Sequence, residues 1–124
     1  MTISQPSERL ASLEALRVEL RQFAAERDWN QFHSPKNLAI ALSVEAAELL
    51  EHFQWMPEAE SAALGTGQKA RIREEVADVL LYLIRLADKL EIDLLAAASD
   101  KIRLNAEKYP VEKARGSSKK YTEL

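Results

Sequence analysis

Two pairs of carboxylates in this sequence have the spacing of a metal site. Glu45 and Glu48 are three residues apart, and so are Glu75 and Asp78. In a helix this spacing places both members of a pair on one face, about one turn apart. Each pair lies among apolar residues, where acidic side chains are rarely left without a partner. We therefore expect the two pairs to face each other and to bind a divalent cation.

Electrostatic repulsion makes such a cluster unfavourable without a cation. Two like charges about 4 Å apart repel by roughly 4 kcal/mol at an effective dielectric constant near 20. Without a metal, some of these groups must take up a proton or stay in contact with water. The alternative interpretation is a solvated acidic face. A single Glu-x-x-Glu pair would favour that alternative, whereas two pairs within two apolar stripes favour the metal site.

The donor atoms indicate which metal to expect. Carboxylate oxygens suit Mg²⁺ or Mn²⁺, and Mg²⁺ commonly also binds substrate phosphates. The chain has no cysteine, which excludes zinc–thiolate sites and thiol nucleophiles. A di-iron bundle needs a Glu-x-x-His repeat on two helices. His33 precedes the second predicted helix and His52 comes four residues after Glu48, so the iron pattern is not met.

Basic and aromatic side chains could supply the rest of a nucleotide site. The chain has no Gly-x-x-x-x-Gly-Lys-Ser/Thr loop, so individual side chains must contact the phosphates. Aromatic rings could stack on a nucleobase, although ordinary packing at helix ends also explains them. The basic tail is equally typical of a disordered terminus. The phosphate candidates are Lys101, Asn105, Lys108, Arg115, Lys119 and Lys120, and the aromatic cluster comprises Trp29, Phe32, His33, Phe53 and Trp55.

Helical periodicity runs through almost the whole chain, which has only three glycines and four prolines. Regularly spaced leucines predict a first helix that begins after Ser4 or Ser7 and ends near Arg27. Ser34 and Pro35 are typical of an N-cap and of a first helical position, so they predict the start of a second helix. This helix should stop before the proline at position 57.

The second half of the chain predicts two more helices. Residues 57–67 have the composition of a loop, and a third helix follows from about residue 68 to residue 90. It is apolar on nearly all sides between residues 76 and 86, which is typical of a buried helix. Asp93 can cap a fourth helix that ends near residue 109. An irregular C-terminal tail, residues 110–124, completes the chain.

These elements predict an all-α fold. Antiparallel helices with short connections favour a four-helix bundle in a single domain that spans residues 1–124. One bundle layer would leave part of the apolar third helix uncovered. We therefore expect an oligomer whose interface includes the third or the fourth helix.

Composition excludes several classes of protein. The net charge is −3, with 30% charged residues, unlike a polybasic nucleic-acid binder or an acidic disordered chain. The N-terminal residues contain no signal-peptide segment, and the longest strongly apolar run, residues 79–84, is too short to span a bilayer. We therefore expect a cytoplasmic protein that binds neither a membrane nor a nucleic-acid polymer.

Longer stretches of the sequence carry a family resemblance. The most specific are residues 29–37, which read WNQFHSPKN, and the tail from residue 109 to residue 122. The full set comprises residues 24–38, 45–49, 53–55, 74–80, 105–110, 115–117 and 120–122. Together they resemble the dCTP pyrophosphatase branch of the MazG-like all-α nucleotide pyrophosphohydrolases, over nearly the whole chain.

That resemblance implies an activity and a set of site residues. It implies Mg²⁺-dependent hydrolysis of deoxynucleoside triphosphates, dCTP and modified dCTP above all, to the monophosphate and pyrophosphate, which cleans the nucleotide pool. It also implies a homotetramer built as a dimer of dimers, in which a neighbouring subunit can complete the site. The implied metal ligands and catalytic residues are Glu45, Glu48, Glu75 and Asp78, and the implied substrate-binding residues are Trp29, His33, Trp55, Tyr82, Lys101 and Asn105. We also expect Tyr109 and the basic residues Lys108, Arg115 and Lys120 to bind the substrate.

Two alternatives stay open at this point. Relatives with the same fold act on modified cytosines, on uracil nucleotides or on several triphosphates, so the substrate could be dUTP or a broader set. The other alternative is a non-catalytic helical module that binds nucleotides or a partner helix. The buried acids argue against it, because a scaffold would gain stability from apolar residues at those positions.

Overall fold

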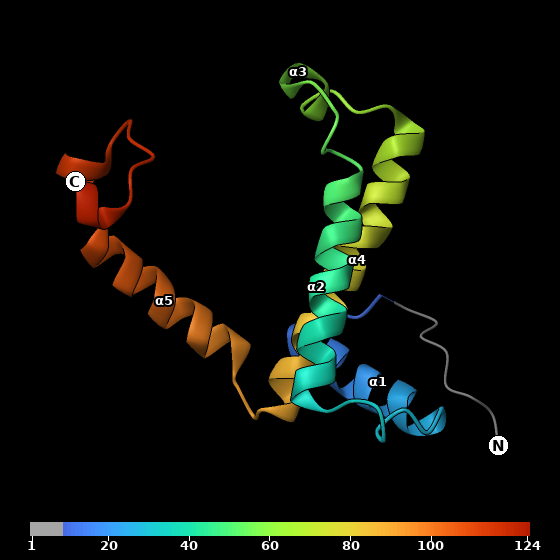
Figure 1. The fold of residues 1–124 in the computed structure, drawn as a ribbon. Coiled ribbons are helices and arrows are strands. Elements are labelled where there is room, and N and C mark those ends of the chain that lie inside the picture. The colour runs from blue at the N-terminus through green and yellow to red at the C-terminus, as the bar shows by residue number, and fades with distance from the viewer. Residues whose placement is uncertain (1–8) are drawn as a thin grey trace. The chain divides into compact units, whose positions relative to one another are not determined.

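The computed structural model describes residues 9–124, and these residues form helices and no β-strand. The chain divides into two compact units, residues 1–91 and 92–124. The all-α prediction is confirmed for the described residues. The first unit contains α1 (Leu13–Glu26), α2 (Pro35–Glu51), α3 (Glu58–Ser61) and α4 (Thr66–Lys89), and the second contains α5 (Leu94–Lys108), α6 (Val111–Ala114) and the 3₁₀ helix η1 (Tyr121–Glu123) (Figure 1).

Two of the helix starts follow directly from local sequence signals. The Ser34 hydroxyl accepts a hydrogen bond from the backbone N–H of Asn37 over 3.1 Å, and Pro35 occupies the first turn of α2. The Asp93 carboxylate accepts one from the backbone N–H of Ala96 over 3.0 Å at the start of α5. These bonds satisfy backbone donors that have no partner within the helix. Both predicted N-caps are confirmed.

Replacing Ser34 with alanine should lower the free energy of unfolding by about 1 kcal/mol, because the N–H of Asn37 loses its acceptor. Urea denaturation measures the change. Ser43→Ala is the matched control within α2, since the Ser43 hydroxyl only bonds back to the carbonyl of Ala39. Such back-bonding slightly destabilises a helix. Equal destabilisation by both substitutions would contradict the role of the cap.

The first helix begins later than predicted. α1 starts at Leu13, and the Ser12 hydroxyl accepts a hydrogen bond from the backbone N–H of Ala15 over 3.0 Å. The predicted starts after Ser4 or Ser7 lie outside the described residues, and residues 9–12 are not helical. The regular spacing of apolar residues extends back to Leu10, but it does not require a helix there. An N-cap such as Ser12 can begin the helix partway along the periodic stretch.

Two segments predicted to be irregular contain short helices. α3 follows Pro57 within the expected loop, and α6 follows Pro110 within the expected tail. Each has only four residues, too few to give a periodic pattern in the sequence. A proline at the start of a helix is favourable because its fixed φ suits the first turn.

The first unit is organised around α4. Figure 1 shows α2 and α4 running antiparallel side by side, and α1 also packs against α4. Ala24 of α1, Leu38 of α2 and Ile84 of α4 are each at most 2% exposed. α1 and α2 therefore both pack against α4. Of the helices described, none is both long and apolar enough to cross a membrane.

Candidate metal and nucleotide site

One face of α4 carries two acidic residues, a tyrosine and an arginine. Glu75, Asp78, Tyr82 and Arg85 follow one another at intervals of three, four and three residues, so they lie along the same side of the helix. From Glu75 to Tyr82 the helix rises by about 10 Å. A nucleotide with its phosphates covers a span of this order. Along this face, the acidic groups of Glu75 and Asp78 are therefore followed by the aromatic ring of Tyr82.

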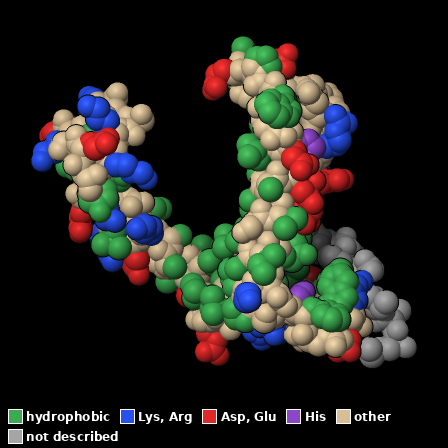
Figure 2. Space-filling model, viewed as in Figure 1, with side chains coloured by type: hydrophobic (Ala, Val, Ile, Leu, Met, Phe, Trp, Pro, Cys, Tyr) green, Lys and Arg blue, Asp and Glu red, His purple; other side chains and the backbone are tan. Residues whose placement is uncertain are grey.

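Three of the four predicted carboxylates come together in what we call the carboxylate cluster. Glu45 and Glu48 of α2 and Glu75 of α4 each place one carboxylate oxygen within 4.8 Å of the others. The second carboxylate oxygens of Glu45 and Glu75 (Oε2) are buried and have no hydrogen-bond partner. Buried carboxylate oxygens without a partner are strongly unfavourable. The all-oxygen set fits a hard divalent cation; Figure 2 shows acidic side chains along the α2–α4 boundary.

Asp78 lies one turn beyond Glu75 and outside the carboxylate cluster. Asp78 is exposed, whereas the three clustered glutamates are partly buried. It lines the cavity described below, which places it between the cluster and that cavity. Its role as a metal ligand stays a prediction. In the described part of the chain, neither His33 nor His52 belongs to a cluster of side chains that could hold a metal ion.

Burial and the neighbouring carboxylates change the pKa of Glu45. Burial is the largest cause that raises the pKa of Glu45, to about 7, and Glu48, Asp78 and Glu75 act in the same direction through their charge. In water a glutamate has a pKa near 4.5. The raised pKa means that Glu45 keeps its proton to a higher pH in the metal-free protein than an ordinary glutamate does.

Without metal, the protein should become less stable as pH rises. Because the folded state holds the Glu45 proton more tightly than the unfolded chain, this group stabilises the fold fully below about pH 4.5 and loses that contribution as pH rises through about 7. Thermal melts in EDTA between these values measure the effect. Mg²⁺ should restore stability, most of all above neutral pH. Glu45→Gln should flatten the pH dependence; an unchanged slope in that variant would contradict the assignment.

A cavity of about 310 Å³ lies beside the cluster, lined by α1, the segment that follows α1, and α4. Its volume is at the lower end of the range for small-molecule sites. Trp29 and His33 line it from the segment after α1, and Tyr82 lines it from α4. The ring centroid of Trp29 lies 5.7 Å from that of Phe23 and 6.1 Å from that of His33. Three predicted substrate-binding residues therefore share one cavity.

A buried arginine that also lines this cavity was not predicted from the sequence as a site residue. Arg85 is 5% exposed. Its Nε donates a hydrogen bond to His33 Nδ1 over 3.2 Å, and its Nη2 donates one to Asn30 Oδ1 over 2.5 Å. An arginine within the apolar stripe of α4 was the available signal, since a charge in such a place needs partners.

The counterion of Arg85 is Asp88, which also binds two arginines of α1. Asp88 accepts hydrogen bonds from Arg17 Nη1 over 3.0 Å, from Arg21 Nε over 3.1 Å and from Arg85 Nη1 over 3.3 Å. Its side chain is 6% exposed. The hydrogen bond from Arg21 is the largest cause that lowers the pKa of Asp88. This network ties α1 to α4 at the base of the cavity.

The other predicted site residues lie elsewhere in the chain. Trp55, just beyond α2, is 89% exposed and does not line the cavity. In the second unit, Lys108 places its Nζ 5.0 Å from the ring of Tyr121, which packs edge-on against Tyr109. The substrate roles of all these residues stay predictions. The remaining ones in that unit are Lys101 and Asn105 on the same face of α5 as Lys108, and Arg115, Lys119 and Lys120, which are exposed.

Comparison with known proteins identifies the family of this chain. Residues 40–124 match the model of the MazG-like family. The chain is 46% identical over 115 residues to dCTP pyrophosphatase 1 from Homo sapiens and from Rattus norvegicus, covering 91% of this chain and 68% of each relative. The crystal structure of a pyrophosphatase from Archaeoglobus fulgidus superposes with a TM-score of 0.75 at 40% identity, over 86% of this chain and 99% of that one. This chain belongs to the MazG-like family.

Proposed function

We propose that this chain is a Mg²⁺-dependent nucleotide pyrophosphohydrolase that converts dCTP and modified forms of dCTP to the monophosphate and pyrophosphate. The observation that carries the proposal is the cavity beside the carboxylate cluster, because one face of α4 contributes side chains to both. The relatives named dCTP pyrophosphatase 1 support the choice of substrate. Such an activity would clean the deoxynucleotide pool, and we propose a cytoplasmic location for it.

The residues of the site have separate tasks in this proposal. Glu45, Glu48 and Glu75 would hold the metal, with Asp78 as a fourth acidic group one turn along α4. Bound Mg²⁺ supplies neutralisation of phosphate charge and orientation of the phosphate oxygens. One glutamate of the cluster orients or deprotonates the attacking water.

The cavity residues would select the nucleoside. Trp29 and His33 present rings on which a base can stack. Tyr82, two turns beyond Glu75 on α4, would lie beside the sugar. A ring packed against C2′ leaves no room for a ribose hydroxyl, which favours deoxynucleotides.

Oligomer formation would complete the protomer. α4 leaves the apolar side chains of Val76, Leu80 and Leu83 between 39% and 51% exposed. Apolar surface of this kind is typical of a protein–protein interface. We propose a single domain with a four-helix bundle protomer and a homotetramer built as a dimer of dimers. A stable monomer in sedimentation at micromolar concentration would contradict the tetramer.

The product assay tests the activity directly. The protein is incubated with Mg²⁺ and each deoxynucleoside triphosphate, and ³¹P NMR identifies the products. We expect monophosphate and pyrophosphate, fastest from dCTP or a modified dCTP. Faster turnover of dUTP would instead favour the uracil nucleotide as substrate. Release of orthophosphate, or tight binding without turnover, would contradict a pyrophosphohydrolase; the second result would favour a binding module.

A further inference from the structure

Arg85 constrains the hydrogen-bonding state of His33. The contact joins Arg85 Nε to His33 Nδ1 over 3.2 Å. A guanidinium group is always protonated and only donates, so Nδ1 must be the acceptor. In a neutral imidazole the other nitrogen, Nε2, then carries the proton. We propose that Arg85 is a positioning residue that fixes His33 as a neutral ring with Nε2–H as the donor to the substrate base, an inference that rests on the proposed function.

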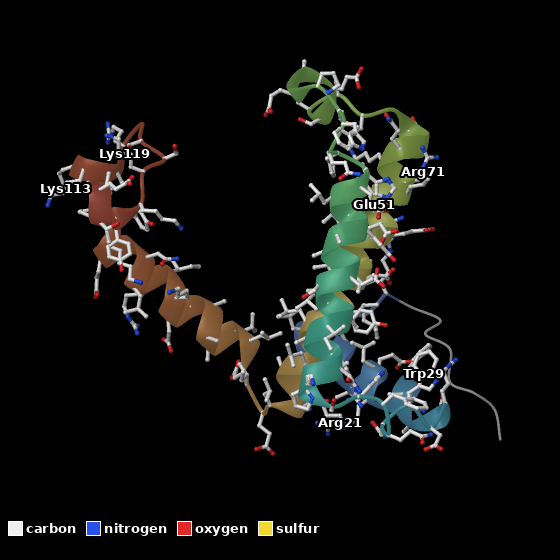
Figure 3. All side chains as sticks on the ribbon, in the orientation of Figure 1. Arg21, Trp29, Glu51, Arg71, Lys113 and Lys119 are labelled. Atoms are coloured by element: carbon white, nitrogen blue, oxygen red, sulfur yellow. The ribbon has the colours of Figure 1, made fainter. Side chains whose placement is uncertain are left out.

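The guanidinium of Arg85 is itself fixed. Its three nitrogens donate to three different residues: Nε to His33, Nη2 to Asn30 Oδ1 over 2.5 Å and Nη1 to Asp88 Oδ2 over 3.3 Å. Both Arg85 and the side chain of Asp88 are at most 6% exposed. Asp88 is held in turn by Arg17 and by Arg21 (labelled in Figure 3 with Trp29). Because each guanidinium nitrogen has a protein partner and Arg85 is only 5% exposed, these contacts hold the guanidinium in one orientation.

The surroundings of His33 also favour the neutral ring. Burial is the main cause that lowers the pKa of His33, and the positive charges of Arg85 and Lys89 lower it further. A protonated ring would direct an N–H at the N–H of Arg85. The neutral ring avoids this clash and carries its single N–H on Nε2, on a residue that lines the cavity.

A single fixed donor has a consequence for base choice. The pairing edge of cytosine offers two adjacent acceptors, O2 and N3, whereas N3 of uracil carries a hydrogen and is a donor. Opposite ring position 3, a donor that cannot become an acceptor would pair with N3 of cytosine and oppose N3–H of uracil, whereas opposite O2 it would pair with either base. A site with a buried, fixed polar group discriminates strongly between such rings, because the wrong ring leaves it unpaired. We therefore infer that the His33 donor faces ring position 3, and that the ligand class is cytosine or a cytosine substituted at another ring position.

Long-range ¹H–¹⁵N correlation spectra of the imidazole nitrogens test the tautomer without any substrate. In His52→Gln protein at about pH 8, His33 is the only histidine left and is neutral. We expect a protonated Nε2 and an unprotonated Nδ1. Arg85→Met should shift the ring to a mixture of tautomers, whereas Arg21→Met, which removes a different partner of Asp88, should keep the original pattern. A protonated Nδ1 in the protein with Arg85 intact would overturn the proposal.

Kinetics then test the consequence for substrate. Arg85→Met should raise KM for dCTP by about tenfold, the effect of one hydrogen bond, with a smaller change in kcat. It should also narrow the preference for dCTP over dUTP. Arg85→Lys, which keeps a cation with N–H donors, should recover part of the loss. An unchanged KM and base preference in Arg85→Met would overturn the proposal. Absence of turnover in the unmodified protein would instead contradict the proposed function and leave the tautomer result standing.

Discussion

Replacing Glu75 with glutamine should lower kcat/KM for dCTP by at least about 10³-fold, the rate equivalent of several kcal/mol of lost electrostatic stabilisation. Glutamine has the shape of glutamate but no charge. It removes one of the three carboxylates of the cluster, and Glu75 carries one of the two buried carboxylate oxygens that have no hydrogen-bond partner among the described residues. A discontinuous assay of pyrophosphate at several Mg²⁺ concentrations measures both the rate and the metal requirement.

The same substitution should stabilise the metal-free protein. With one charge fewer, Glu45 and Glu48 no longer share a site with a third carboxylate, so the midpoint of thermal unfolding in EDTA should rise. Glu74→Gln is the matched control, because Glu74 is the exposed neighbour on the same helix and should change neither quantity much. Loss of activity together with a lower melting temperature would point to a structural role for Glu75 instead.

Replacing Asp88 with alanine should lower the free energy of unfolding by about 3–5 kcal/mol, because it leaves the buried Arg85 without a counterion. The substitution also separates the two arginines of α1 from α4. Urea denaturation at neutral pH measures the loss. Asp100→Ala is the control: its partner Arg103 is 70% exposed and Asp100 itself 63% exposed, so the change there should be below about 1 kcal/mol.

The pH dependence of this contribution has a defined sign. The pKa of Asp88 is lowered in the folded protein, by Arg21 first and then by Arg17. The contribution is therefore fully present above the ordinary aspartate pKa of 3.8 and is lost only as pH falls through the lower folded value. Asp88→Ala should accordingly cost the same at pH 6 and pH 8. A loss confined to one end of that range would contradict the ion-pair explanation.

The sequence predicted the elements that depend on local chemistry. Ser34 and Asp93 marked the starts of α2 and α5 because a capping side chain bonds a backbone donor three residues away. The carboxylate cluster was also accessible from sequence, since spacing on a helix determines which acids share a face. The later start of α1 was not, because Leu10 continues the apolar period beyond the Ser12 cap.

The missed residues depend on contacts between distant parts of the chain. Arg17 and Asp88 are 71 residues apart, and Arg85 and His33 are 52 apart. A periodic pattern assigns a residue to a face but not to a partner on another helix. The apolar pattern also left open which side chains of α4 stay uncovered in one chain, and Val76, which is 51% exposed, is one of them.

A crystal structure of the protein with Mn²⁺ and a non-hydrolysable dCTP analogue would test directly whether the carboxylate cluster and the cavity form one site. Mn²⁺ takes the same oxygen ligands as Mg²⁺ and can be located by its anomalous scattering. We expect the ion among Glu45, Glu48 and Glu75, and the cytosine ring in the cavity beside Trp29 and His33. An ion bound elsewhere, or a base outside that cavity, would contradict the central claim that these two features form one catalytic site.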